Sequence, residues 1–171
     1  MKIPRKLGLS FLVINASAAL VMAIFLANIM MIDRSTEVSN FSQSIYAKAL
    51  TLETSILRQN SQFRGFLVTG DESYLKSYGE GRVDFDDATR ELKQLLKDPK
   101  KLALVRESDK AARAWRRDWG DRMIALVRSG HREEAQAAVR AAGPKVLVSA
   151  VALPLRALRA AETEEIESAS A

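Results

Sequence analysis

The chain has 171 residues, enough for one domain plus an accessory segment. Hydrophobic residues make up 47%, which is sufficient for a core, whereas aromatic residues make up only 6%. The absence of cysteine excludes a disulfide, a thiolate metal site and a cysteine nucleophile. Eight glycines and four prolines are too few for the turns of a β-sandwich, so the composition predicts an all-α fold.

The net charge of +5 is concentrated at the N-terminus. Residues 1–32 contain Lys2, Arg5 and Lys6 and no acidic residue, so they contribute +3 and leave +2 for the rest of the chain. A nearly neutral domain lacks the basic surface that nucleic-acid binding requires. We therefore expect no nucleic-acid partner, and a basic flank at residues 1–6 that lies against a membrane.

Residues 7–32 contain no charged side chain, which predicts a transmembrane helix. At about 1.5 Å per residue this run is ~39 Å long, more than the ~30 Å hydrocarbon core of a bilayer. The basic flank precedes the run and Asp33 follows it. By the positive-inside rule, residues 1–6 are cytoplasmic and residues 33–171 form an extracytoplasmic domain.

A cleaved signal peptide is the alternative, because Ala16-Ser17-Ala18 has the chemistry of a cleavage site. Cleavage there would leave the apolar residues 20–32 exposed at a new N-terminus, which favours an uncleaved anchor. We expect a single-pass protein of the inner (cytoplasmic) membrane. Its main domain is periplasmic if the source is a Gram-negative bacterium.

Past Asp33, apolar residues recur at steps of three, four or seven and predict four helices. The apolar face of the first helix is formed by Val38, Phe41, Ile45, Ala49, Leu52, Ile56 and Phe63, and that of the second by Leu75, Tyr78, Phe85, Leu92 and Leu95 or Leu96. The face of the third helix is formed by Leu102, Val105, Ala112, Trp115, Trp119, Met123 and Leu126, and that of the last by Val146, Val151, Leu155 and Leu158. Nothing between Ile32 and Gly65 breaks a helix. The membrane helix is therefore expected to run directly into the first helix of the domain.

Turn residues separate the predicted helices. Asp98-Pro99 suits an N-cap with proline at the first helical position, and Ser129-Gly130 ends the third helix. A short Ala-rich turn at 131–142 leads to Gly143-Pro144 and the last helix, which Pro154 should kink. Short connections favour antiparallel neighbours, so the sequence predicts an up-down antiparallel four-helix bundle.

Two side-chain clusters could carry binding chemistry. One contains Arg113, Arg116, Arg117 and Arg122 interleaved with Trp115 and Trp119, a pattern that can stack nucleic-acid bases. For a nearly neutral, extracytoplasmic domain we instead expect the tryptophans in the core and the arginines in solvent. The only histidine, His131, has just Glu133 and Glu134 nearby, so no metal site is expected.

The sequence shows no catalytic arrangement. Acidic clusters at 84–87 and 162–167 lack a paired nucleophile or base. No phosphate-binding loop, hydrolase elbow or zinc motif occurs. We therefore expect a protein that is not an enzyme and that needs no cofactor and no metal.

The most specific stretch is QFRGFLVTGDESYL at residues 62–75. It predicts the end of one helix, a tight corner at Thr69-Gly70-Asp71 and the start of the next helix. Gly65 costs about 1 kcal/mol of helix stability relative to Ala, and Arg64 in an apolar run needs a partner or a route to water. We expect Gly65 to allow a close approach of helices and Arg64 to bridge them.

The segment RGFLVTGDESYL closely resembles the hallmark of the CHASE domain of type three, an extracytoplasmic sensory domain of bacterial transmembrane receptors. The resemblance covers about residues 33–167; the twelve-residue motif is specific, and the rest is helix order and length. It implies a four-helix bundle in receptors that feed histidine kinases of two-component systems, chemotaxis-type domains or cyclic-dinucleotide enzymes. The hallmark positions, with a structural or signalling role, fall on Arg64, Gly65, Phe66, Leu67, Thr69, Gly70, Asp71, Tyr74 and Leu75.

Two functions remain open at this point. Domains of this kind are normally followed by a second membrane helix and an output domain, whereas this sequence stops at Ala171, and residues 146–155 are too short and proline-broken to span. The first hypothesis is the signal-input module of a receptor, a homodimer that binds an unidentified small ligand or protein. The alternative is a free-standing, membrane-tethered helical protein that binds another envelope or receptor protein.

Overall fold

The computed structural model describes residues 3–170, with side chains described at 15–27, 30 and 36–169. The elements in chain order are α1 (Ile3–Thr69), α2 (Ser73–Leu95), α3 (Pro99–Trp115), the π-helical η1 (Arg116–Asp121), α4 (Arg122–Arg128), α5 (Arg132–Ala142), the 3-10 turn η2 (Gly143–Val146) and α6 (Ser149–Ser170). No strand occurs within residues 3–170, which confirms the predicted all-α class.

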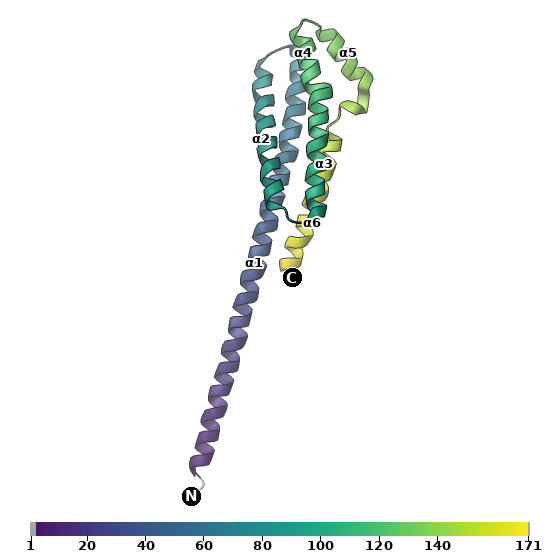
Figure 1. Cartoon of the computed structure of the whole chain (residues 1–171). Coiled ribbons are helices and arrows are strands. Elements are labelled where there is room, and N and C mark those ends of the chain that lie inside the picture. Colours follow the sequence, from purple (N-terminus) through teal and green to yellow (C-terminus); the bar gives the residue numbers. More distant parts are fainter. Residues whose placement is uncertain (1–2, 171) are drawn as a thin grey trace.

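Helix α1 dominates the shape of the molecule. It runs unbroken for 67 residues, which at about 1.5 Å per residue is ~100 Å. Its C-terminal half packs among the other helices, and its N-terminal half extends away from them as a single rod (Figure 1). The predicted continuity between the apolar N-terminal segment and the first helix of the domain is confirmed for the backbone.

The membrane span predicted at residues 7–32 is described only in part. The side chains at 1–14, 28, 29 and 31–35 lie outside the described residues, which leaves the basic flank untested. The described section, Asn15–Ala27, is an apolar helix shorter than a bilayer requires. Among described residues, the stretch long and apolar enough to cross a membrane is instead Arg132–Ala169 at the C-terminal end. That stretch is interrupted by η2, and Leu155 within it is fully buried in the core.

Local signals position several helix ends as predicted. The Asp98 carboxylate accepts a hydrogen bond from the Lys100 N–H at 2.7 Å, and Pro99 takes the first helical position of α3. At the other end of this region, α4 stops at Arg128, and Gly130 follows with a φ of 87°. These caps satisfy backbone groups that a helix end leaves without partners.

The middle of the chain departs from the predicted pattern. The expected single third helix contains the π-helical turn η1 between α3 and α4, which apolar spacing does not signal. Residues 131–142, expected as a short turn, form the full helix α5, because Ala, Glu, Gln and Arg are strong helix formers. Helix α6 starts at Ser149, since Val146 belongs to η2, and it continues through Pro154.

Helices α1, α2, α3 and α6 lie side by side (Figure 1). Helix α1 contacts α2 and α6, and α3 contacts α2 and α6, with the α2–α3 seam the least extensive of the four. Fully buried side chains that these four helices contribute to the core include Ile45, Leu52, Ile56, Phe63, Phe85, Leu92, Val105, Leu155 and Leu158, and α4 adds Met123. Phe63 meets the Trp115 ring edge to face at 5.6 Å. The predicted core faces are buried or half-buried except at Val38 and Phe41, which are exposed.

A buried carboxylate joins α1 to α6. Glu53 accepts a hydrogen bond from Arg156 Nε at 2.7 Å on one oxygen, and Arg159 Nη2 lies 2.6 Å from the other. Nearer the C-terminus, Ser42 Oγ donates to Glu165 at 3.1 Å. These contacts fix the register between the first and last helices along the packed region.

The core assignment of α6 predicts a contrast between two leucines. Leu155→Ala should lower the free energy of unfolding by about 2–5 kcal/mol, because Leu155 is 0% exposed and its removal leaves a cavity. Leu153, on the same helix, is 61% exposed, and Leu153→Ala should change stability by less than about 0.5 kcal/mol. Urea unfolding followed by circular dichroism measures both variants. Equal losses would contradict this packing.

Candidate functional site: the α1–α2 corner and its pocket

The hallmark motif forms the corner between α1 and α2. Gly65 lies in the last turns of α1, and the half-buried Tyr74 begins α2. A Cβ added at Gly65 would lie 2.4 Å from Cε1 of the Tyr74 ring, closer than side chains pack. The close helix approach expected at Gly65 is therefore present, and Tyr74 is the group that makes it.

Short-range hydrogen bonds among motif residues close the turn. Gly70 has a φ of 73°, the left-handed conformation predicted for the end of α1. Thr69 Oγ1 donates to the Gly65 carbonyl at 2.8 Å and accepts from the Asp71 N–H at 3.1 Å. The Asp71 carboxylate accepts from the Ser73 N–H at 2.8 Å, and this bond lowers the pKa of Asp71. The N-cap position of α2 is Glu72, one residue later than predicted, although the Asp71 carboxylate still accepts from the first N–H of the helix.

Helix α5 covers the corner from the other side. Gln136 Nε2 donates to the Leu67 carbonyl at 2.8 Å, and Arg132 Nη1 donates to the Thr69 carbonyl at 3.0 Å. Both carbonyls belong to the last turn of α1, where helix geometry provides no partner. Phe66 and Leu67 are buried at the same place. The end of α1 is thus bonded to α5 as well as turned into α2.

Arg64 does not bridge helices, so that expectation is wrong. Its side chain is exposed, and it forms no hydrogen bond or ion pair with another described residue. The last hallmark residue, Leu75, is half-buried and packs against the core. The other hallmark residues lie together at the corner, where they shape the backbone and the core.

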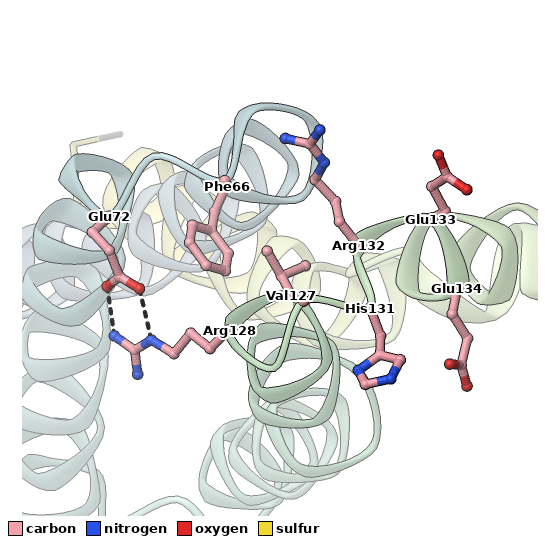
Figure 2. Close-up of a pocket in the computed structure, with 10 residues that line it drawn as sticks. Phe66, Glu72, Val127, Arg128, His131, Arg132, Glu133 and Glu134 are labelled. Carbon is pink, nitrogen blue, oxygen red and sulfur yellow. Dashed lines mark hydrogen bonds and ion pairs between the residues drawn. The ribbon is translucent and has the colours of Figure 1, made fainter.

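A pocket of about 770 Å³ adjoins this corner (Figure 2). Phe66 from α1 and Val127 from α4 supply its apolar part. Glu72 and Arg128 pair beside them through two hydrogen bonds of 2.8 and 2.6 Å, which join the start of α2 to α4. The remaining lining residues are Gly70, Gly130, His131, Arg132, Glu133 and Glu134.

Charges of both signs line the pocket. The bond from Arg128 lowers the pKa of Glu72, so this pair is ionised at neutral pH. His131 Nδ1 lies 3.0 Å from Ser129 Oγ. No group of three or more side chains suited to a metal ion is found in the described part of the chain. The walls therefore present charged and hydrogen-bonding side chains of both signs.

The burial of one arginine was not predicted from the sequence, from which all the arginines near Trp115 were expected to lie in solvent. Arg113, Arg117 and Arg122 are exposed, but Arg116 is only 4% exposed. Its partners lie 57 and 30 positions away along the chain, on α1 and α2. Periodicity alone cannot reveal partners so distant in sequence. The π-helical turn that begins at Arg116 is the structural signal.

A family model for the CHASE3 domain matches residues 35–171, and this chain belongs to the CHASE3 family. Members are extracytoplasmic sensory domains of receptors, a class of domains that is not catalytic. The resemblance drawn from the RGFLVTGDESYL motif is confirmed. Comparison with curated proteins and with solved structures finds no match to this chain.

The Gly65–Tyr74 contact makes Gly65→Ala destabilising. The added methyl collides with the ring at a cost of about 1–3 kcal/mol, and replacing a helical glycine returns about 1 kcal/mol, so the net loss is about 1 kcal/mol and at most about 2 kcal/mol. Gly79 on α2 is the matched control, because a Cβ there meets nothing within 4 Å. Gly79→Ala should stabilise by about 0.5–1 kcal/mol. Chemical unfolding measures both, and adding Tyr74→Ala should relieve the loss at Gly65.

The exposed position of Arg64 predicts a nearly neutral substitution. Arg64→Ala should change the free energy of unfolding by less than about 0.5 kcal/mol, because no described contact is lost. Thermal melting of the variant beside the parent provides the measurement. A loss of about 1–3 kcal/mol, the value for a lost charged hydrogen bond, would restore the bridging role.

Proposed function

We propose that this chain is the signal-input module of a bacterial membrane receptor. The observation that carries the proposal is the continuity of α1, which joins the corner at Thr69 to the apolar segment Asn15–Ala27 without a break. Membership of an extracytoplasmic sensory family supports it. The output would be a histidine kinase, a chemotaxis-type domain or a cyclic-dinucleotide enzyme.

In this proposal the N-terminal half of α1 crosses the inner membrane once, with its N-terminus in the cytoplasm. Exposed apolar side chains in the described part of that half support it, since a bilayer would cover them: Leu20, Val21, Met22, Ile24, Phe25, Leu26 and Met30. The remaining helices would form an up-down four-helix bundle in the periplasm, which the closed ring of contacts among α1, α2, α3 and α6 supports.

The outer face of α1 has the pattern of a dimer seam. Exposed residues with alternating steps of four and three are Gln43, Ala47, Leu50, Thr54, Leu57 and Ser61, a set that we call the α1 stripe. None of them is charged, and the stripe is ~27 Å long at about 1.5 Å per residue. Thr54 Oγ1 donates to the Leu50 carbonyl at 3.0 Å, so its hydroxyl is already bonded within the helix. Alternating steps of this kind bring two helices together as a coiled coil.

A homodimer through the α1 stripe fits the membrane geometry, because two copies anchored by α1 are necessarily parallel. A stimulus at the bundle would shift α1 against α6, which are coupled through Glu53 and its two arginines. Packed helices typically slide by 1–2 Å in such transitions, about the size of one residue's rise along a helix. The unbroken α1 would carry that shift to the membrane side.

The test is disulfide crosslinking, which the cysteine-free chain allows without background. Leu57→Cys, at a position 44% exposed within the α1 stripe, should form a symmetric disulfide dimer in membranes under mild oxidation. Val83→Cys is the matched control, because Val83 is 59% exposed on α2 and outside the stripe. It should remain monomeric under the same conditions.

Two outcomes would count against the dimer. Equal crosslinking of both variants would show random collision rather than a seam. Crosslinking of Leu57→Cys to a different protein, with no symmetric dimer, would favour the membrane-tethered interaction protein instead. Non-reducing electrophoresis separates the three species by mass.

A further inference from the structure

The seam between α2 and α3 is lined by charge, unlike the apolar interior. A pocket of about 530 Å³ opens there, within the range of small-ligand sites. Its cationic lining residues are Arg82, Arg90, Lys93, Arg113 and Arg116, and its carboxylates are Asp86 and Asp109. Asp121 and Asp87, outside the lining, pair with Arg82 and Arg90. Five cations therefore face four carboxylates, which leaves an excess of positive charge.

Asp109 shows how this excess arises. It accepts from Lys93 Nζ at 2.5 Å and from two nitrogens of Arg113 at 2.9 and 2.8 Å. Burial raises the pKa of Asp109, but these bonds and charges outweigh it and hold the pKa below the ordinary 3.8. One carboxylate thus serves two cations, and Arg113, whose side chain is 70% exposed, can turn toward an incoming anion.

Arg116 is the buried charge of the pocket. Its Nε donates to Gln59 on α1 at 2.9 Å, its Nη1 donates to Asp86 on α2 at 2.7 Å, and its guanidinium lies 5.1 Å from the centre of the Phe85 ring. Its Nη2 is buried and has no hydrogen-bond partner among the described residues. The Nη2 group of Arg116 can therefore donate a hydrogen bond to one further acceptor.

A second polar group in the same pocket lacks a partner. Thr89 lies on α2, is 5% exposed and leaves its Oγ1 without a hydrogen bond to any described residue. A buried polar group without a partner costs about 1–3 kcal/mol. Two such groups on facing helices, Thr89 and Arg116, point to a ligand that supplies acceptor atoms.

We propose that this pocket, the α2–α3 pocket, binds a small carboxylate-bearing anion and that Arg116 passes its occupancy to α1. Asp86 holds Arg116 by one hydrogen bond, and its side chain is 48% exposed, so it can swing into solvent. A ligand carboxylate in its place would accept from Nη1 and Nη2 together, which is the favoured bidentate geometry. The hydroxyl of Thr89 would donate to the same ligand.

Gln59, a residue of α1, connects Arg116 to that helix. It is fully buried, accepts from Arg116, and donates from Nε2 to the Gly81 carbonyl of α2 at 2.9 Å. A shift of Arg116 toward a ligand must alter this contact, so the ligand favours one position of α1 over another. This step rests on the proposed signal-input function, because it names the class of stimulus.

The test uses the full chain in detergent, titrated at constant ionic strength with acetate, succinate and citrate and, as an anion without a carboxylate, with inorganic phosphate. Calorimetry and tryptophan fluorescence, to which Trp115 next to Arg116 contributes together with Trp119, should show saturable binding of at least one carboxylate. Thr89→Val should weaken binding about three- to tenfold, the effect of one hydrogen bond, and Arg113→Gln should weaken it about tenfold. Arg117→Gln is the matched control, because Arg117 is exposed, pairs with Asp118 and does not line the pocket.

The outcomes separate this inference from the proposed function. No saturable binding, binding of inorganic phosphate alone, or an equal loss in Arg117→Gln would each overturn the carboxylate site. Binding that leaves the disulfide rate of Leu57→Cys unchanged would overturn the link through Arg116 while keeping the site. The titration needs no dimer, so failure of crosslinking without ligand would count only against the proposed function.

Discussion

A guanidinium group held almost wholly out of water is the constraint on which this helical arrangement depends. Burying a charge costs several kcal/mol unless partners surround it. Arg116 obtains its partners from Gln59 on α1 and Asp86 on α2, with the Phe85 ring beneath it. Three helices must therefore keep a common register for one side chain to be satisfied. The Glu53 contacts extend the same requirement to α6.

The features that could be predicted from the sequence are those set by interactions between residues close together in the chain. Periodicity identified the buried faces, as at Leu52 and Leu155, because a helix core repeats every three or four residues. Caps such as Asp98 were readable because donor and acceptor lie two residues apart. Arg64 was expected to bridge helices and is exposed, whereas Arg116 was expected in solvent and is buried. Both predictions failed because the burial of an arginine depends on partners that are distant in the sequence. The corner could thus be predicted, and the α2–α3 pocket could not.

The hallmark motif and the α2–α3 pocket differ in the kind of structure that their residues form. Gly65, Gly70 and Tyr74 shape a turn through backbone conformation and close packing, which any ligand-independent scaffold needs. The walls of the α2–α3 pocket are charged and polar side chains of α2, α3 and η1. In the proposed site, the choice of ligand would depend on these side chains and not on the corner. The motif identifies the scaffold and says little about the stimulus.

The unbroken course of α1 also sets a rule for its length. Each residue turns a helix by about 100°, so one residue inserted between Asn15–Ala27 and the α1 stripe would rotate the two faces by that angle relative to each other. Seven inserted residues would bring the faces back to within about 20°. Eleven inserted residues would do the same, so in the proposed dimer the lengths of α1 that keep the two faces aligned would differ by about seven or eleven residues. If α1 spans the membrane as proposed, the distance between the membrane and the α1–α2 corner would change in steps of ~10 or ~16 Å, at about 1.5 Å per residue.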